Sequence, residues 1–519
     1  MVEPNITKSN KSKLPVKTSS SYIIPADFPD PDIIRVDDTY YMVSTTMHFM
    51  PGCVILRSYN LVDWEHAAYV YDELEATEKE TLTDNKGAYG KGMWAACIRH
   101  HNDKFYISFV ANDLGKTFLF TADKIEGPWQ RSEIKGFYHD MSLLFDDDGR
   151  VYCVSGNMNI TLTEMEADLS GPKAGGINKV IIRDNPENVI LGYEGSHIYK
   201  INGKYYIFFI HMPKGKMRTQ ACYVSDKIEG PYTGGDVLCS DLGGWNSGTA
   251  QGGIVQTPDG KWFSIVFQDH GALGRIPVLV PVHFKNDFPV FGTDGIAPEK
   301  IEVTDNRPDY KYSPLYSNDF TNSAWQWNHI PNKKLISLNS NNFTVTTDKI
   351  CRNPIQAANT LTQRTFSEHC SGSVEINVSK LNDGDIAGLC ALEGQYGFIG
   401  ITKEKGKYKL ITAEHKIPYS PWAMGVFDDN EPDIIAKQDI FTDKLILKAT
   451  FNLEHNKEHV QFSFADIDNK SSNFKDFGAP VKLLYTLDQF VGVRFALFCY
   501  STKESGGKAS FKEFKIELL

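Results

Sequence analysis

The chain has 519 residues, 41% of them apolar, so it can bury a sizeable core and is too long for one ordinary domain. Its net charge of −11 argues against sequence-independent binding of nucleic acid or an anionic membrane, because either would need a basic face. The sequence also lacks an apolar run of about 18 residues, the length that a membrane span needs. We therefore expect no nucleic-acid or membrane partner, and a neutral substrate fits the charge better.

The first twenty residues are polar, rich in Lys and Ser and free of aromatic side chains, which predicts a disordered leader over residues 1–20. Nine cysteines are scattered along the remaining chain without a C-x-x-C pair. This favours buried reduced thiols over a zinc site or a disulfide framework. Unpaired cysteines and the lack of a signal peptide favour a cytoplasmic location, with an extracellular protein whose signal is absent from this sequence as the alternative.

Five segments of the first half share one design: a short apolar strand, a turn of Asp, Asn or Gly, and an alternating aromatic strand. They cover residues 32–45, 97–110, 142–155, 197–210 and 253–266. Two copies are followed by nearly identical sequences, TADKIEGPWQ (121–130) and VSDKIEGPYT (224–233). A repeat of hairpin plus outer strand is typical of four-stranded propeller blades, so residues 21–305 are predicted to form a five-bladed β-propeller.

The aromatic hairpin repeat stops near NRPDYKYSP, and residues 306–314 are predicted to form a linker. From residue 315 to residue 519 the chain alternates strands with polar turns, as in SGSVEINVS and VGVRFALFCYS. This rhythm predicts a two-sheet β-sandwich as an accessory domain. The predicted fold class is therefore all-β.

Carboxylates at the starts of inner blade strands should meet across the channel of a propeller. Asp30 precedes the first blade hairpin, Asp140 holds the matching place in blade three, and Glu194 does so in blade four. Asp30 belongs to the stretch PADFPDPD, which carries two further acids. We expect Asp27 to cap the turn into the blade, and Asp32 to lie deeper in a supporting hydrogen-bonding role.

The stretches that carry these acids resemble the signatures of glycoside hydrolase family 43. They are FPDPDIIRVDDTYYM, GMWAACI, YHDMSLLFDDDGRVY and YEGSHIYKINGKYY. The second half, through DFTNSAWQWNHIP and AGLCALEGQYGFIGI, resembles the β-xylosidase and α-L-arabinofuranosidase branch of that family. The resemblance implies a propeller followed by a concanavalin-like β-sandwich.

The resemblance also implies roles for the three acids. Family members invert the anomeric centre, and inversion needs two carboxyl groups about 6.5–9.5 Å apart so that a water fits between them. Asp30 matches the general base and Glu194 the general acid. Asp140 matches the acid that orients Glu194 and raises its pKa by like-charge repulsion.

Five further positions match family residues around the sugar: Arg275, Trp94, Met47, His48 and Phe49. Met47 stands where β-xylosidases commonly have Phe, so the sugar preference stays open. No cofactor is required by this assignment. Many members hold a calcium ion with a histidine at the channel axis, where this chain has Gln251, which is a weak candidate for a structural Ca²⁺ ligand. His139, His211 and His270 are expected to be hydrogen-bonded structural histidines.

The first hypothesis for function is an exo-acting inverting glycosidase that removes terminal α-L-arabinofuranosyl or β-D-xylosyl units from hemicellulose-derived (arabino)xylan oligosaccharides. Its partner would be an oligosaccharide or polysaccharide substrate, and the sequence does not predict an oligomeric state. A non-catalytic carbohydrate-binding protein on a relict scaffold and an endo-arabinanase are the alternatives.

Overall fold

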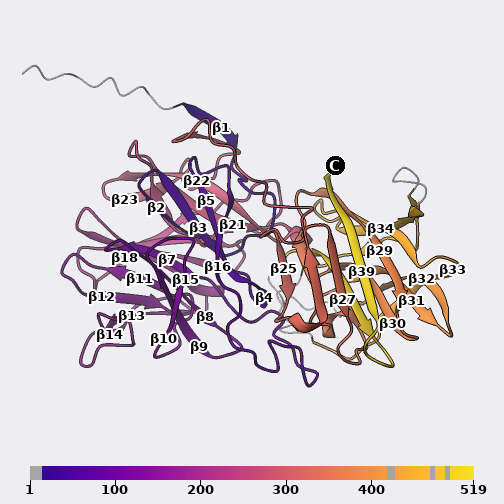
Figure 1. Ribbon diagram of the computed structural model, residues 1–519. Coiled ribbons are helices and arrows are strands. Elements are labelled where there is room, and N and C mark those ends of the chain that lie inside the picture. The colour runs from indigo at the N-terminus through magenta and orange to yellow at the C-terminus, as the bar shows by residue number, and fades with distance from the viewer. Residues whose placement is uncertain (1–14, 418–426, 468–473, 486–490) are drawn as a thin grey trace, which may run out of the picture.

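The computed structural model describes residues 15–417, 427–467, 474–485 and 491–519. Nearly all of its regular structure is β-strand, with three short 3₁₀ helices: η1 (Gly271–Leu273), η2 (Lys333–Leu335) and η3 (Pro354–Gln356). The first half forms five small sheets around a centre and the second half two large stacked sheets, which lie at the left and right of Figure 1. A five-bladed propeller followed by a sandwich is thus confirmed.

The five predicted hairpins form the inner two strands of the five blades. Blade one contains β2 (Asp32–Val36), β3 (Thr39–Ser44), β5 (Gly52–Ser58) and β6 (Glu65–Tyr71). Blade two contains β7 (Cys97–His101), β8 (Lys104–Ala111), β9 (Lys116–Ala122) and β10 (Gln130–Ile134). Blade three contains β11 (Ser142–Phe145), β12 (Val151–Ser155), β13 (Asn159–Met165) and β14 (Asn178–Arg183). Blade four contains β15 (Val189–Ile201), β16 (Lys204–Pro213), β17 (Thr219–Ser225) and β18 (Thr233–Leu238). Blade five contains β19 (Thr249–Ala250), β20 (Ile254–Gln256), β21 (Trp262–Asp269), β22 (Arg275–Lys285) and β23 (Phe288–Phe291).

The first and last blades are joined by the segment that precedes blade one. Ile23 N donates to Pro277 O (3.2 Å), and Phe28 N donates to Arg275 O (3.0 Å). Residues 16–20, which the prediction placed in a disordered leader, form strand β1 (Val16–Ser20) paired with β24 (Lys300–Thr304). Tertiary pairing with a partner almost 300 residues away overrides the polar local composition here, and such pairing is invisible to local pattern. Residues 1–14 of the predicted leader lie outside the described residues.

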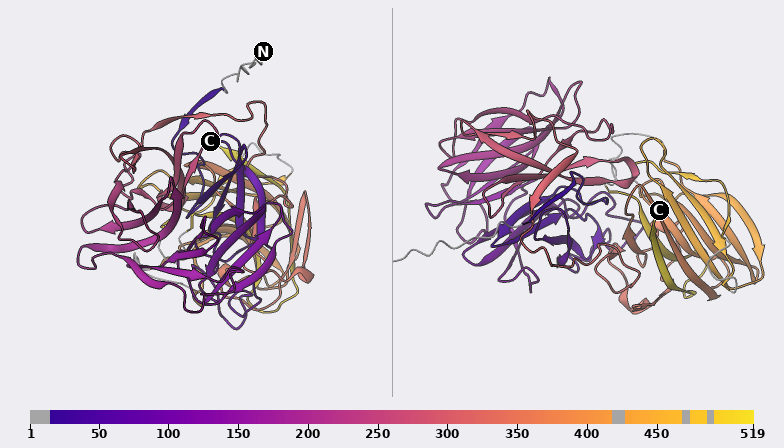
Figure 2. Two further views of the ribbon diagram at one scale, coloured as in Figure 1. Left: turned by 90° about the vertical axis from the view of Figure 1, so that its left-hand side faces the viewer. Right: turned by 90° about the horizontal axis from the view of Figure 1, so that it is seen from above.

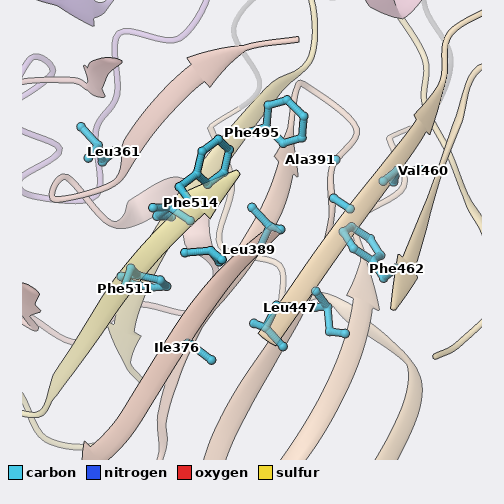
Figure 3. Packing of buried hydrophobic residues seen from close by; sticks show 14 of the residues in the cluster. Leu361, Ile376, Leu389, Ala391, Leu447, Val460, Phe462, Phe495, Phe511 and Phe514 are labelled. Atoms are coloured by element: carbon cyan, nitrogen blue, oxygen red, sulfur yellow. The ribbon is translucent and has the colours of Figure 1, made fainter. Parts of the chain in front are cut away.

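The sandwich consists of two sheets packed face to face. One has the order β33 (Asp433–Ile440), β32 (Lys407–Glu414), β31 (Gly397–Glu404), β30 (Asp385–Leu392), β38 (Arg494–Ser501), β28 (Leu361–Arg364), β25 (Trp325–Asn328), β4 (Phe49–Met50). The other has the order β26 (Ile336–Asn339), β27 (Asn342–Thr346), β39 (Lys508–Leu518), β29 (His369–Lys380), β34 (Lys444–Asn452), β35 (His459–Ala465), β36 (Lys475–Asp476), with β37 (Val481–Lys482) also on β35. Alternate residues of both sheets point inward and form the core in Figure 3, which includes Leu389, Leu447, Phe495 and Phe511.

The two domains share a sheet. Strand β4 belongs by sequence to the loop between β3 and β5 of the propeller, but it pairs with the edge of the sandwich, Met50 opposite Trp327 and Phe49 opposite Asn328. Figure 1 shows β4 at the boundary beside β25, and Figure 2 shows the two domains in contact from other directions. The predicted linker is also packed, because Ser313 N donates to Glu65 Oε2 (3.0 Å) and Tyr59 N donates to Tyr312 Oη (2.8 Å). The blade-one side of the propeller is thereby fixed to the sandwich.

All nine cysteines are free thiols, eight of them buried and Cys239 exposed. Within the described ranges, no helix has the length and apolar character needed to cross a membrane.

Candidate active site

A pocket of about 320 Å³ opens at the centre of the propeller, where the inner strands of the blades begin. All five blades contribute to its wall. It brings together seven of the nine predicted site residues: Asp30, Met47, Trp94, Asp140, Glu194, Gln251 and Arg275. Asn157, Leu191, Ile210, Met212 and Arg218 also line the wall.

Asp30 is held at the pocket by its backbone and by two side chains. Its φ of 52° lies in the left-handed region, which a non-glycine residue rarely adopts. Thr45 N and Ser44 Oγ both donate to the carbonyl of Pro29 (3.1 and 2.7 Å), which fixes the preceding peptide. Thr45 Oγ1 donates to Asp30 Oδ2 (2.7 Å) and Arg275 Nη1 to Oδ1 (2.6 Å). Both carboxylate oxygens are therefore oriented.

The Asp30 carboxylate is the end of a buried chain of charges. Arg275 Nε donates to Asp269 Oδ1 (3.2 Å), and Arg218 pairs with the other oxygen of Asp269. Although burial opposes it, these two guanidinium groups lower the pKa of Asp269. Asp269 thus stays anionic and fixes Arg275 at its place beside Asp30.

Asp140 and Glu194 face each other across blades three and four. Asp140 also has a left-handed φ, of 48°, and its Oδ2 accepts from Gly195 N (3.1 Å), while its carbonyl accepts from Ser196 N (3.3 Å). Glu194 lies in β15, where the register with β16 shifts on both sides of it. A bulge of this kind re-aims a side chain. Asp140 therefore binds the backbone that carries Glu194, which suits an orienting role.

The acids share their surroundings with His139. Its Nε2 is 3.4 Å from Glu194 Oε2 and 3.8 Å from Asp140 Oδ2, and its ring meets Trp94 edge-on at 6.0 Å. The negative charge of Asp140, followed by Glu194 and Asp30, raises the pKa of His139 to about 9. Asn157 Nδ2 donates to the same oxygen of Glu194. Glu194 thus has two polar neighbours besides Asp140.

Repulsion between the carboxylates of the pocket affects the pKa of Asp140. Burial, with the charges of Glu194 and Asp30, raises the pKa of Asp140 to about 6, and the His139 charge works in the opposite direction. Asp140 therefore binds a proton more readily than an ordinary aspartate does.

Of the predicted sugar contacts, Trp94 and Met47 lie in the pocket wall. Trp94 Nε1 donates to Gly90 O (3.2 Å), which fixes the indole, and Met47 packs beside it. His48 and Phe49 lie elsewhere. The buried His48 ring packs 4.3 Å from Phe49 and 4.5 Å from His329 of the sandwich, measured between centroids. Both side chains lie at the domain interface, and Phe49, in β4, packs in one cluster with Met47, against which Trp94 also packs, so Phe49 supports the pocket wall without lining the pocket. The placement gives no support to their predicted sugar contact.

Gln251 lines the pocket from blade five, and its backbone N donates to Gln220 Oε1 (2.7 Å). Its side chain lies against Gly195, where an added Cβ would come within 2.7 Å of Gln251 Cγ. Asp32 is the carboxylate that lies deeper in the channel than Gln251. It lies beside Gly253, and its charge is already neutralised by Arg99. Calcium takes about six to eight oxygen ligands, so one amide oxygen and an already paired acid do not fit it. The channel calcium stays a prediction that the donor set disfavours.

Asp32 fills the channel below the pocket. Its Oδ2 accepts from Ile98 N (2.9 Å) and Arg99 Nη1 (2.7 Å), and its Oδ1 lies 3.0 Å from His197 Nδ1. Arg99 also lines a separate hollow at the opposite end of the inner strands, so the cluster of Asp32, Arg99 and His197 separates the two openings. The expected supporting role of Asp32 agrees with these contacts.

Two comparisons with protein families cover most of the chain. The model of "Glycosyl hydrolases family 43" matches residues 20–289, which hold all three acids, and that of "Beta xylosidase C-terminal Concanavalin A-like domain" matches residues 316–517. The chain belongs to glycosyl hydrolase family 43. It is therefore a glycoside hydrolase, and its sandwich is the concanavalin-like domain found with family β-xylosidases.

Relatives within family 43 carry two kinds of name. A "Beta-xylosidase" of Formosa agariphila is 26% identical over 93% of this chain and 88% of its own length. A "Non-reducing end alpha-L-arabinofuranosidase" of Bacteroides ovatus is 30% identical over 54% of this chain and 55% of its own length. A solved structure titled as a bifunctional GH43-CE protein of Bacteroides eggerthii is 39% identical, with a TM-score of 0.87, over 98% of this chain. This chain covers 64% of that protein.

Sequence reasoning missed several residues of this family 43 site. His139 was expected to be structural, but it contacts both acids at the acid side of the pocket. Its position directly before Asp140 was the available signal. Asn157, Arg218 and Asp269 come from loops and strand ends without a local pattern, so only the fold shows that they converge.

Proposed function

We propose that this family 43 enzyme is an exo-acting, inverting glycosidase that releases terminal pentose units, α-L-arabinofuranosyl or β-D-xylosyl, from (arabino)xylan oligosaccharides. The observation that carries the proposal is the placement of Asp30 opposite the Asp140–Glu194 pair in one pocket. The relatives named β-xylosidase and α-L-arabinofuranosidase supply the two candidate sugars.

In the proposed reaction Asp30 accepts a proton from a water as the water oxygen bonds to the anomeric carbon. Arg275 and Thr45 each hold one oxygen of Asp30, so the carboxylate is oriented before the water arrives. Glu194 donates its proton to the glycosidic oxygen as the bond from that oxygen to the anomeric carbon breaks. The reaction consumes one water: its hydroxyl bonds to the anomeric carbon, its proton goes to Asp30, and the separate proton of Glu194 goes to the leaving oxygen, so proton exchange with solvent must restore both carboxyl groups.

The shape of the site supports attack on chain ends. The cluster of Asp32, Arg99 and His197 closes the channel below the pocket, so a sugar can enter from one side only. Met47, Trp94 and Leu191 supply apolar surface against which the C–H faces of one ring can pack. A closed pocket of about 320 Å³ suits a terminal sugar better than the middle of a polymer.

The first test compares hydrolysis of 4-nitrophenyl α-L-arabinofuranoside and 4-nitrophenyl β-D-xyloside, with proton NMR following the anomer released first. We expect turnover of at least one substrate with inversion. Retention of configuration would contradict the mechanism, and sugar binding without turnover would indicate a relict binding protein. A ladder of oligosaccharides released from arabinan would indicate an endo-arabinanase.

A second test separates the roles of the acids. Glu194→Gln should lower turnover of xylo- or arabino-oligosaccharides by about 10²–10⁴-fold, because the sugar leaving group needs a proton. It should lower turnover of the 4-nitrophenyl glycosides much less, because nitrophenolate leaves without one. Equal losses on both substrate types would contradict the assignment of Glu194 as the general acid.

A further inference from the structure

The chain segment that carries Asp30 is gripped by the sandwich as well as by the propeller. Arg364, at the end of β28, is buried and donates its Nε to the backbone carbonyl of Asp27 (2.7 Å). Its guanidinium also lies over the ring of Phe28, 4.4 Å from the centroid. Ser367 N donates to Pro25 O (2.7 Å). Three successive parts of the stretch before Asp30 are therefore held by one short stretch of the second domain.

The same face of the sandwich holds the segment that carries Arg275. Val493 N donates to Ala272 O (2.8 Å), and Gly492 lies so close that an added Cβ would fall 2.3 Å from Leu273 O and 3.1 Å from Asp27 Cβ. A side chain at residue 492 would push the two segments apart. The sandwich thus contacts both chain segments that converge on Asp30, the one that precedes it and the one that precedes Arg275.

Asp27 connects these two segments. Its Oδ1 accepts from Arg275 N (2.8 Å), while Phe28 N donates to Arg275 O (3.0 Å). Arg275 then reaches Asp30 with Nη1 (2.6 Å). Asp27 therefore connects three parts of the structure: Arg364 of the sandwich, the segment that carries Asp30, and Arg275, which binds Asp30. This is a larger role than the turn cap that the sequence predicted.

We propose that the sandwich domain positions the general base, with Arg364 as the positioning residue that acts on Asp30 through Asp27 and Phe28. The inference rests on the proposed function for its kinetic consequence. The physical reason is geometric: a base must hold its water in line with the anomeric carbon, and a displacement of about 1 Å can lower the rate about 100-fold. Arg364 does not contact the pocket residues of blades two to four, which would bind the sugar. Substrate affinity should therefore depend on Arg364 much less than the rate does.

Arg494 offers a matched control. It lies directly opposite Arg364 in the register of β28 and β38, and it is equally buried. Both arginines donate to Gln326 Oε1, Arg364 at 3.1 Å and Arg494 at 2.9 Å. The guanidinium of Arg494 lies over Phe49 at the domain interface, 3.5 Å from the ring centroid, and its other hydrogen bond goes to Thr362. Both guanidinium groups act on Asp27 through their charge, but only Arg364 hydrogen-bonds the base segment, so the two residues differ chiefly in the propeller segment that they contact directly.

The experiment compares Arg364→Met with Arg494→Met in the full chain, at temperatures where both are folded. We expect Arg364→Met to lower kcat by about tenfold to 100-fold with KM changed less than about threefold, and Arg494→Met to keep kcat within about threefold. Arg364→Lys should recover part of kcat, because an ammonium can still reach the Asp27 carbonyl. Equal kcat losses in the two Met variants, or a loss confined to KM, would overturn the inference.

A second measurement is independent of turnover. Hydrogen exchange of the peptide spanning residues 26–34 should accelerate at least about tenfold in Arg364→Met and stay near the parent rate in Arg494→Met, since Phe28 N–H is protected by Arg275 O. If the parent enzyme hydrolyses neither nitrophenyl pentoside, the proposed function fails, and exchange alone decides the inference. Unchanged exchange in Arg364→Met would overturn it whatever the substrate is.

Discussion

Asp30 and Asp32 lie two residues apart at the start of blade one, and the structure uses them in opposite ways. Asp30 faces the pocket, accepts one hydrogen bond on each oxygen from Thr45 and Arg275, and shares the pocket with two other acids. Asp32 is completely buried, and backbone N–H groups, Arg99 and His197 surround its two oxygens. Although burial opposes it, the charges of Arg99 and His197 hold the pKa of Asp32 well below its usual range.

Asp30 and Asp32 differ in their access to the pocket and in the charges that surround them. Burial, together with the negative charges of Glu194 and Asp30, raises the pKa of Asp140 to about 6, although the charge of His139 opposes this shift. The Asp32 cluster is balanced and saturated with donors, so it has no capacity left to accept a proton from a substrate water. Asp30 is also paired, with Arg275, but it borders the open pocket, whereas Asp32 is completely buried among its partners, so access to the pocket distinguishes the two carboxylates.

The largest expected effect is at Asp30. Asp30→Asn should lower turnover of both nitrophenyl and oligosaccharide substrates by about 10³-fold or more, because no leaving group removes the need for a base. The thermal midpoint should change little, since the amide oxygen can accept from Arg275, the amide NH2 can donate to the Thr45 hydroxyl, and Asp269 still pairs with Arg275. Circular dichroism melting and single-substrate kinetics check both points. Loss limited to oligosaccharides would assign Asp30 to the leaving-group side instead.

The next largest effect is at Asp32, on stability. Asp32→Asn leaves the buried Arg99 guanidinium without its anion, which should lower the free energy of unfolding by about 3–5 kcal/mol. Because the pKa of Asp32 is lowered in the folded state, its contribution is complete above pH ~4 and is lost as pH falls further, so the difference from the parent should be constant at neutral pH and shrink in acid.

Urea unfolding at several pH values measures that difference, and Asp37→Asn is a suitable control. Asp37 is an exposed turn residue with a φ of 53°, a conformation that asparagine also accepts, so its variant should stay within about 0.5 kcal/mol of the parent. Turnover per folded molecule of Asp32→Asn should remain near the parental value. A variant of normal stability that is inactive would place Asp32 in the reaction.

Local pattern was sufficient to predict the blades and to place the three acids at the starts of inner strands, while their catalytic roles came from the resemblance to family 43. Each hairpin carries its own signal, a period of two with a turn of Asp, Asn or Gly, and each acid lies directly before or within such a segment. The same signal predicted strands such as β29 (His369–Lys380) and β38 (Arg494–Ser501) of the sandwich.

What the sequence did not predict depends on pairs that are distant along the chain. Strand β4 has two residues, and its partner Trp327 is more than 270 positions away, so nothing local shows that His48 and Phe49 turn toward the sandwich. Arg364 and Asp27 are separated by 337 positions. Contacts of this kind follow from how two domains dock, which is decided by the whole surface of each.

The smallest expected effect is a shift in the pH dependence of turnover when the charge of His139, beside the pocket acids, is removed. His139 carries positive charge, because Asp140 and Glu194 raise its pKa to about 9, and this charge lowers the pKa of Asp140. His139→Gln removes the charge, so Asp140 should hold a proton to higher pH, and the basic limb of the kcat/KM profile should move upward by about one pH unit. His211→Gln is the control, since His211 lies between Asp184 and Asp236, with its nitrogens 3.3 and 2.8 Å from their oxygens, and should leave the limb in place. An unmoved limb in His139→Gln would mean that the His139 charge has no effect on the titrating acid, and a lowered limb would contradict the sign of that effect.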